Sequence, residues 1–466
     1  MRRWLTVLIA LAVPGAVAIW WFAPRQVGRI EPPIRVGILH SRTGPMKISE
    51  ESMIDAEVMA LKEINAAGGL LGGRLVEWVI ADGQSDWPKF AQEAQRLIDE
   101  EKVSVIIGCW TSASRKSVKP VVEQKKHLLI YPMAYEGLEQ SPNIVYTGAA
   151  PNQQVIPAVS WCFETLKARK FFLVGSDYVW PHCVNEIIKD ELKALGAECV
   201  GESYILFGSP SVEDSVAAIA KAAPDAIIST VVGDSNEPFY RRLQAAGILP
   251  EHTPVLSFSI AEDELRKLPL KAMVGDYAAW DYFQSIDRPE NRAFVQRFKA
   301  LYGADRVTSD VIEAAYNSVY LWAQAVAEAE TDHVADVIKA IRRQSLNAPE
   351  GIVSVDEETQ HTWRPVSIGR IRGDGQFDLV WSSEKPIRPI PYPPSRTHSE
   401  WESFLDSLYR GWGGWANPGK GGRSAPEAFQ DQPPRLQFPP LSEGGSGGFW
   451  ATDRLVRTRA NNGLKS

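Results

Sequence analysis

Four short segments combine aromatic, hydroxyl and small side chains directly after apolar, β-branched runs. They span residues 108–116, 131–137, 175–181 and 230–236. In an open parallel α/β sheet, ligands bind outside the carboxyl ends of the strands, which is where these segments would lie. Because the segments are divided between two repeated halves of the chain, we expect them to line a cleft between two lobes.

The aromatic side chains of these segments have the character of pocket walls. Aromatic faces exclude water and hydroxyl groups give directional hydrogen bonds, a combination that suits a small polar ligand. For any single residue, ordinary packing in a core or at its rim is the alternative. The set consists of Trp110, Tyr131, Tyr135, Tyr178 and Trp180.

Polar groups occupy the same strand ends. Ser112 and Ser114 could bond a ligand or cap the helix that follows them, and both roles can hold at once. The Asp234 carboxylate only accepts hydrogen bonds, so it suits the NH₂ groups of urea or an amide, or an ammonium group, unless it caps the next helix. We expect Arg115 and Lys116 to be surface charge on a helix. A cleft with one carboxylate and no committed cation favours a neutral or cationic nitrogen compound over an anion.

The sequence carries no recognisable catalytic pattern. Its 7 histidines are scattered, without a His-x-x-x-His pair. No Gly-x-Ser-x-Gly elbow is present, and no phosphate-binding glycine loop follows the first strand. The 4 cysteines match no zinc-site spacing. We therefore predict that the chain is not an enzyme, with no catalytic residues, no metal and no cofactor.

Composition indicates a globular protein of about two domains. The chain has 466 residues, 44% of them hydrophobic and 23% charged. A net charge of −7 argues against nucleic acid and anionic membrane surfaces as partners. The cysteines are expected to be mostly buried small hydrophobes. If the chain is exported, Cys183 and Cys199 are the pair to test for a disulfide.

The N-terminal segment predicts export. Arg2 and Arg3 precede an apolar run of about 20 residues that ends at Ala23, long enough to span a bilayer. A small-x-small site at 16–18 also suits signal cleavage. We favour an uncleaved membrane anchor over a cleaved signal peptide. In either case the remainder of the chain would be periplasmic or otherwise extracytoplasmic.

Strand and helix patterns alternate from residue 34 onward. They predict two parallel α/β units with right-handed crossovers, the second starting after Pro151. Residues 352–381 read as antiparallel strands with a hairpin turn at 373–375. The composition changes near Pro386 to Pro, Gly, Ser and Trp, so we expect little core and mostly disorder at the end of the chain.

These motifs together resemble the type I periplasmic substrate-binding proteins of ABC transporters. Within them the chain looks most like the urea and short-chain amide group, and it is similar also to the amide-sensing regulator of amidase operons. Pro45, Lys47, Met133 and Ala134 depart from the usual pattern of that group. The matching stretches include residues 36–41, 82–88, 108–116, 131–137, 142–154, 175–181 and 233–236.

The resemblance implies a two-lobed α/β fold of the type I periplasmic-binding-protein class. Each lobe would be a parallel sheet flanked by helices, with three hinge crossovers and a ligand trapped by closure. By motif match, the ligand-binding residues would be Trp110, Ser112, Tyr131, Met133, Tyr178 and Asp234. The expected divisions are an anchor or signal at 1–23, a linker at 24–33, an N-terminal lobe at 34–149 and 272–345, a C-terminal lobe at 150–271 and 346–390, and a mostly disordered tail at 391–466.

The expected partners follow from the same resemblance. They are a small neutral nitrogen ligand, urea or an amide, and the permease subunits of an ABC transporter. The N-terminal segment would attach the protein to the membrane. Nucleic acid is not expected as a partner. The alternatives are a sensor that regulates amide or urea metabolism and a binder of a branched-chain-type amino acid. A hydrolase such as an amidase is a third, against which the missing nucleophile–base pattern counts.

Overall fold

The structure is a computed structural model that describes residues 31–415. The predicted anchor or signal at 1–23 and the part of the predicted tail beyond residue 415 lie outside the described residues. Within 31–415, no helix has both the length and the apolar character needed to cross a bilayer.

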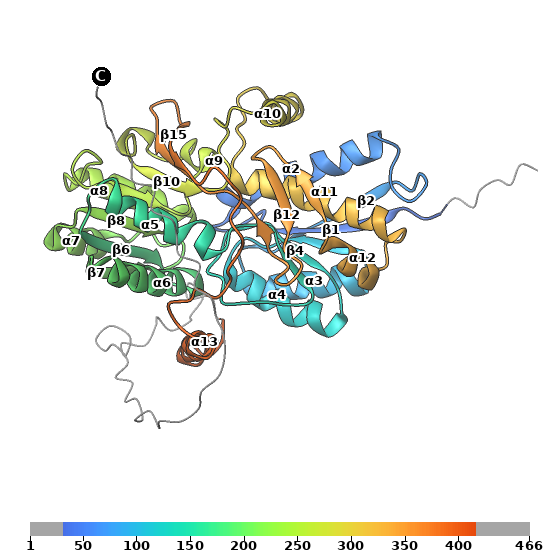
Figure 1. Ribbon diagram of the computed structural model, residues 1–466, viewed down its shortest axis with the longest axis horizontal. Helices are drawn as coiled ribbons and strands as arrows, with labels where there is room; N and C mark the ends of the chain where they lie inside the picture. The colour runs from blue at the N-terminus through green and yellow to red at the C-terminus, as the bar shows by residue number, and fades with distance from the viewer. Residues whose placement is uncertain (1–30, 416–466) are drawn as a thin grey trace, which may run out of the picture. The chain divides into compact units, whose positions relative to one another are not determined.

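The first lobe is built on a five-stranded sheet in the order β2-β1-β3-β4-β5 (Figure 1). All neighbouring strands are parallel. Strands covered on both faces read as continuous apolar runs, which is the pattern of this sheet in the sequence. The strands are β1 (Ile34–His40), β2 (Val76–Asp82), β3 (Val105–Gly108), β4 (Leu129–Tyr131) and β5 (Ile144–Tyr146).

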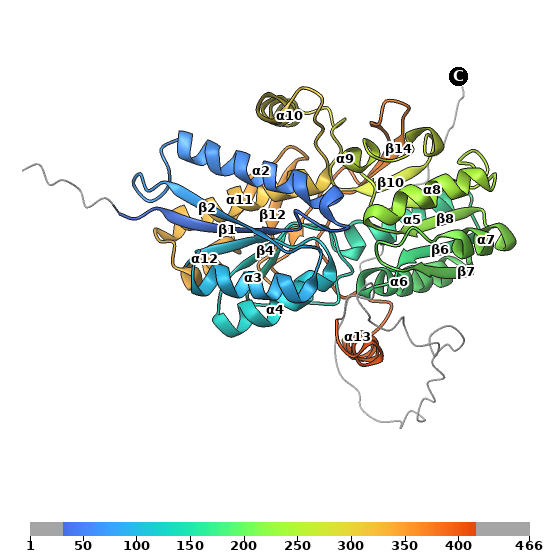
Figure 2. The ribbon, with the colours of Figure 1, turned by 180° about the vertical axis from the view of Figure 1, so that it is seen from behind.

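Helices cover both faces of this sheet. Helices α2 and α11 pack together, as do α3 and α4, and the two pairs lie on opposite faces (Figure 2). Side-chain caps begin two of them: Asp86 accepts from the backbone N–H of Lys89, and Thr111 accepts from that of Ser114. Thr111 therefore takes the capping role considered for the two serines. The helices are α2 (Lys47–Ala66), α3 (Trp87–Asp99), α4 (Ser112–Lys125), α10 (Pro289–Tyr302), α11 (Asp310–Ala329) and α12 (Val334–Ile341).

The second lobe holds a seven-stranded sheet in the order β15-β14-β10-β9-β8-β6-β7. Strands β6 to β10 are parallel to their neighbours, and β14 and β15 add an antiparallel edge. The predicted turn at 373–375 joins β14 to β15 and is confirmed. The strands are β6 (Lys170–Ser176), β7 (Glu198–Ile205), β8 (Ala226–Thr230), β9 (Val255–Ser257), β10 (Tyr277–Trp280), β14 (Ser367–Ile371) and β15 (Phe377–Ser382).

Helix α5 precedes the first strand of this lobe, and its other helices follow the parallel strands, as crossovers require. A single turn, η2, lies between β8 and α8. The elements are α5 (Val155–Glu164), α6 (Val179–Leu195), α7 (Glu213–Ala222), η2 (Gly233–Ser235), α8 (Asn236–Ala245) and α9 (Glu262–Leu265).

Two segments belong to the opposite lobe from the one predicted. The sequence placed 272–345 in the N-terminal lobe, where α10, α11 and α12 lie, but β10 within this range pairs with β9 and β14 in the second sheet. It placed 346–390 in the C-terminal lobe, where β14 and β15 lie, but the small sheet of 345–363 lies against the first lobe, because Gln360 donates to the carbonyl oxygen of Ile144 at 2.7 Å. Strand pairing decides lobe membership, and local periodicity carries no information about the partner strand. The small sheet contains β11 (Ser345–Asn347), β12 (Ile352–Val355) and β13 (Thr362–Trp363).

The start of the predicted tail is helical. Helix α13 (His398–Trp412) begins with a capping box in which Thr397 and Glu400 bond each other's backbone N–H. Its buried residues Trp401, Leu405 and Leu408 follow the helical period. The expectation of mostly disorder was wrong for this stretch because the Pro and Gly residues that suggested it flank the helix.

The four cysteines are free thiols, so the structure contains no Cys183–Cys199 disulfide. Cys109, Cys162 and Cys183 are buried, and Cys199 is half-buried in β7. Three of the four therefore have the expected character of small core side chains.

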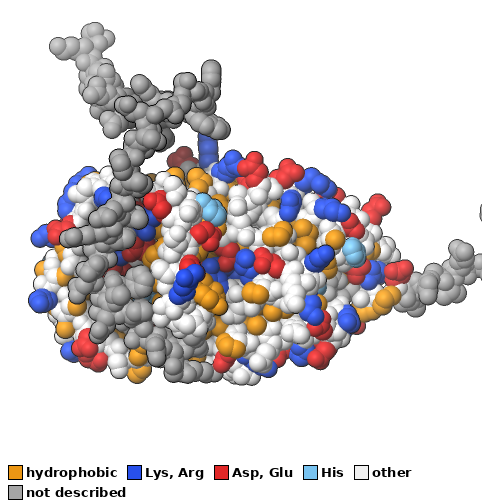
Figure 3. All heavy atoms as spheres, turned by 90° about the horizontal axis from the view of Figure 1, so that it is seen from below, with side chains coloured by type: hydrophobic (Ala, Val, Ile, Leu, Met, Phe, Trp, Pro, Cys, Tyr) orange, Lys and Arg blue, Asp and Glu red, His pale blue; other side chains and the backbone are white. Residues whose placement is uncertain are grey.

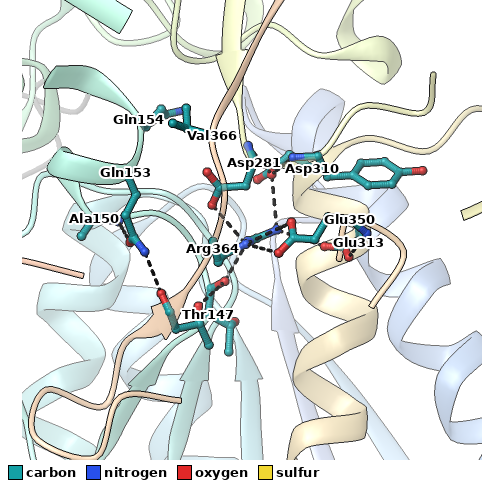
Figure 4. Close-up of polar contacts among 12 residues, drawn as sticks. Thr147, Ala150, Gln153, Gln154, Asp281, Asp310, Glu313, Glu350, Arg364 and Val366 are labelled. Carbon is teal, nitrogen blue, oxygen red and sulfur yellow. Dashed lines mark hydrogen bonds and ion pairs between the residues drawn. The ribbon is translucent and has the colours of Figure 1, made fainter. Parts of the chain in front are cut away.

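One guanidinium joins the three crossovers between the lobes (Figure 4). Arg364, just after β13, donates from Nη1 to the carbonyl oxygen of Thr147, just after β5, at 2.8 Å. Its Nε lies 3.0 Å from the Asp281 carboxylate, just after β10. Arg364 is completely buried. The three connecting segments are thus held at a single point.

The surroundings of Arg364 are strongly acidic. Its guanidinium also contacts Asp310 at 3.5 Å, Glu313 at 3.0 Å and Glu350. Burial raises the pKa of all four carboxyl groups, well above the usual value for Asp281 and Glu313, although Arg364 lowers each of them. Four ionised carboxylates around one cation would leave a large buried negative charge, so the cluster retains protons.

Replacing Arg364 should destabilise the whole protein. In Arg364→Met the carboxyl groups of the cluster lose their only described cationic contact, so we expect a loss of about 3–5 kcal/mol in the free energy of unfolding. Guanidinium chloride denaturation measures this. Arg372→Met, in the exposed hairpin, is the matched control and should leave stability nearly unchanged, because its ion pairs are screened by solvent. Equal losses in both variants would contradict a special role for Arg364.

Candidate ligand-binding cleft

The two lobes touch where the carboxyl ends of their strands face each other. The Trp87 ring, at the start of α3 in the first lobe, stacks on Tyr178 of the second with centroids 6.1 Å apart. Trp87 also contacts Phe207, with centroids 5.3 Å apart. Near the same place, a Cβ on Gly233 would come within 2.8 Å of the carbonyl oxygen of Pro45. The lobes are therefore closed on each other along the edge where the sequence predicts ligand binding.

Five of the six predicted ligand-binding residues are buried together at this edge. Tyr131 donates its hydroxyl to the carbonyl oxygen of Trp110 at 2.7 Å. Tyr178 of the second lobe stacks on Trp87 of the first, and burial, followed by the charges of Tyr131 and Glu136, raises the pKa of Tyr178 well above its usual value. The five, none more than 3% exposed, are Trp110, Ser112, Tyr131, Met133 and Tyr178.

The indole N–H of Trp110 is a donor without an acceptor. It is buried and makes no hydrogen bond with any residue of 31–415, the part of the chain that the structure describes. An unpaired buried donor costs about 1–3 kcal/mol, which an acceptor on a ligand would recover. The neighbouring indole of Trp87 is different, because it donates to the Thr111 hydroxyl at 2.7 Å.

Asp234 does not join the other five. It lies on η2 with an exposed side chain. Partial burial raises its pKa, and the charges that act on it are Lys267 and Glu237, not groups of the cleft. It does not cap the following helix either, since α8 has no side-chain cap.

Arg115 and Lys116 are buried, so the expectation of surface charge was wrong. Arg115 bonds Glu139 through Nε at 2.9 Å and Glu136 through Nη2 at 2.8 Å. Lys116 reaches Glu139 at 3.1 Å. The first turn of α4 faces the loop after β4, which carries both glutamates. Glu136 and Glu139 were the feature of the sequence that could have predicted this burial. They lie too far along the chain from Arg115 and Lys116 for a local pattern to pair them.

This cluster ties the cleft residues to one another. Ser112 donates its hydroxyl to Glu136, and the Arg115 guanidinium lies 4.8 Å from the centre of the Tyr131 ring. Burial alone would raise the pKa of Glu139, but Arg115 and Lys116 outweigh it and hold that pKa well below its usual value. Two cations and two anions thus balance within the cluster, which leaves no net charge to attract an ionic ligand.

The first loop of the cleft rests on a second buried group that sequence reasoning missed. Glu50 accepts from the backbone N–H of Ser41 at 2.6 Å. His40 lies 2.9 Å from Glu57 and 3.5 Å from Glu50. Burial alone would lower the pKa of His40, but the two carboxylates raise it to about 9.

A family model described as the periplasmic binding protein domain matches residues 34–398. The chain therefore belongs to the periplasmic binding protein family. This confirms the predicted fold class, with its two lobes and three crossovers. The assignment to the urea and amide group within the family is a finer statement that this match does not make.

The proteins similar to this binding protein are named for different ligands or activities. A leucine-specific-binding protein from Salmonella typhimurium is 22% identical over 347 residues, 71% of this chain and 89% of that one. A protein named limonene hydroxylase from Geobacillus stearothermophilus is 37% identical over 121 residues, 26% of this chain, so the match spans only 22% of that relative's length. A solute-binding protein from R. palustris, solved in complex with benzoate, shares the fold with a TM-score of 0.69 and 19% identity, covering 77% of this chain and 98% of that one.

His40 should remain protonated in the folded protein at neutral pH. Because its pKa rises from 6.5 to about 9, its charge contributes stability below pH 6.5 that is lost as the pH rises through 9. NMR of histidine-labelled protein measures the titration, with His40→Asn to assign the signal. Titration of this ring below pH 7 would contradict the ion-pair account.

Removal of the Trp87 ring should favour an open arrangement. Trp87→Ala deletes both aromatic contacts across the cleft, so we expect a larger radius of gyration in small-angle X-ray scattering. Trp78→Ala, half-buried on β2 of the first lobe, is the control for losing a tryptophan. The interpretation fails if the two variants scatter like the unmodified protein.

Proposed function

We propose that the protein is the extracytoplasmic substrate-binding component of an ABC transporter and captures urea or a short-chain aliphatic amide by closure of the two lobes. The buried, unpaired indole N–H of Trp110 carries this proposal. The carbonyl oxygen of urea or an amide is an acceptor of the required kind. Export through the N-terminal segment, with residues 1–23 as a membrane anchor, belongs to the same proposal.

The charge balance of the cleft supports a neutral ligand. Arg115, Lys116, Glu136 and Glu139 pair among themselves. A carboxylate or ammonium ligand would have to disrupt those pairs or enter without a counter-charge, and both are costly in a buried site. A neutral amide needs only hydrogen bonds.

Hydrogen-bond complementarity gives each end of the ligand a partner. Urea and amides offer NH₂ donors beside their carbonyl oxygen, and the buried Glu136 carboxylate, already held by Ser112 and Arg115, is an acceptor of the kind they need. Glu136 thus takes the acceptor role that the sequence suggested for Asp234. Met133 adds an apolar wall that suits the alkyl group of an amide.

The face of the molecule in Figure 3 has no concentration of one charge. Basic and acidic side chains alternate there with apolar ones. This pattern, with the net charge of −7, suits a small-molecule binder rather than a nucleic-acid binder.

A branched-chain amino acid is the second candidate ligand. A relative named leucine-specific-binding protein aligns over 89% of its length. Such a zwitterion needs separate partners for its ammonium and carboxylate groups. Because the cluster beside Ser112 is already neutral, the geometry favours urea or an amide. A sensor that binds the same ligand but regulates a partner would use the same cleft.

Thermal unfolding with candidate ligands tests the proposal. Urea, acetamide, leucine and benzoate are added separately at millimolar concentration, where urea does not act as a denaturant. At 100 times its Kd, a ligand of the native state adds about 2.7 kcal/mol of stability. We expect urea or acetamide to stabilise the protein, and Trp110→Phe to weaken that ligand's binding about 10- to 100-fold by removing one donor.

Trp78→Phe, away from the cleft, is the matched control and should leave ligand binding unchanged. Stabilisation by leucine or benzoate alone would contradict the proposed ligand class and leave the transporter assignment in place. An unchanged affinity in Trp110→Phe would show that its N–H does not contact the ligand.

A further inference from the structure

Helix α13 lies almost entirely beyond the residues that the family model matches. The family match ends at residue 398, and α13 begins at His398. The R. palustris structure is covered over 98% of its length by only 77% of this chain. The segment 391–415, which contains α13, therefore needs a role of its own.

The segment is fastened to the second lobe through α6. The Arg396 guanidinium bonds both carboxylate oxygens of Asp190 at 2.8 Å and Glu186 at 2.8 Å. At the other end of α13, Trp412 packs edge-on against His182 with ring centroids 5.2 Å apart. Arg396 and its partners are each less than one quarter exposed, at 24%, 20% and 23%. A bidentate, half-buried pair of this kind fixes orientation as well as distance.

The same segment is fastened to the first lobe through α4 and the loop after β4. The carbonyl oxygen of Pro391 accepts from the backbone N–H of Leu138 at 2.8 Å. The Lys116 ammonium lies 5.1 Å from the centre of the Trp415 ring. A groove of about 360 Å³ separates α13 from α4, so packing is looser on this side than on the α6 side.

Helices α4 and α6 start at the two walls of the cleft. Helix α4 begins at Ser112, beside Trp110, and α6 begins at Val179, beside Tyr178. Opening of the hinge must separate these helices, because they belong to different lobes. A segment bonded to both must then release one of them. In Figures 1 and 2, α13 lies next to α4 and α6 in both views.

We propose that residues 391–415 form a strap that holds the two lobes closed across the mouth of the cleft. The looser contact with α4 is the one that releases, while Arg396 keeps α13 on α6. The strap shifts the equilibrium towards the closed form before any ligand is present. This inference concerns closure only, and it stands whichever ligand the cleft takes.

Distance measurement between the lobes tests the strap. Spin labels are placed in the full chain at Lys62→Cys on α2 and Lys221→Cys on α7, both exposed, with Cys199→Ser to remove the half-buried native thiol. Pulsed electron resonance then gives the ratio of long to short distances without ligand. In Arg396→Glu, which repels Asp190 and Glu186, we expect this ratio to rise about fivefold.

Charge exchange provides the specific control. Arg396→Glu combined with Asp190→Arg restores an ion pair in the opposite sense, so the ratio should return towards the unmodified value. Arg410→Glu, exposed on α13 and paired only with Asp406 of the same helix among the described residues, should leave the ratio unchanged. An unchanged ratio in Arg396→Glu, or a change that Asp190→Arg does not reverse, would overturn the strap.

Discussion

The lobes of this protein are held in register by one buried guanidinium. Arg364 follows β13 and contacts Thr147 and Asp281, so the three crossovers between the lobes meet at its side chain. A hinge needs this convergence, because crossovers that moved independently would let the lobes slide as well as rotate. The positions of the cleft walls therefore depend on a contact that lies in the hinge itself and not among the predicted ligand-binding residues.

Buried charge is compensated by protonation in the hinge and by ion pairing beside the cleft. Around Arg364, carboxyl groups outnumber the cation, and the cluster is tolerated only because burial keeps protons on some of them. Beside the cleft, Arg115 and Lys116 meet two glutamates and the charges cancel. The neutral cluster orients Ser112 and Tyr131 without imposing a charge on the ligand. In the proposed function, selectivity for a neutral ligand rests on the balanced charges of this cluster behind the cleft wall.

Much of the fold followed from local pattern. The strand and helix alternation, the hairpin at 373–375 and the division into two α/β units were predictable, because buried parallel strands and amphipathic helices leave distinct periodicities. The cleft corners were also predictable, since a parallel sheet places all its carboxyl ends on one edge. Five of the six predicted ligand-binding residues are buried together there.

The sequence by itself determined the family, the two-lobed plan and the aromatic character of the cleft. Only the tertiary structure decided that β10 pairs in the second sheet, that Arg115 and Lys116 are buried beside Glu136 and Glu139, and that α13 contacts both lobes. Each of these depends on residues far apart in the chain. The periodicity of a segment shows which of its faces is buried. It does not show which distant strand or charged side chain packs against that face, because only the folded chain brings those groups together.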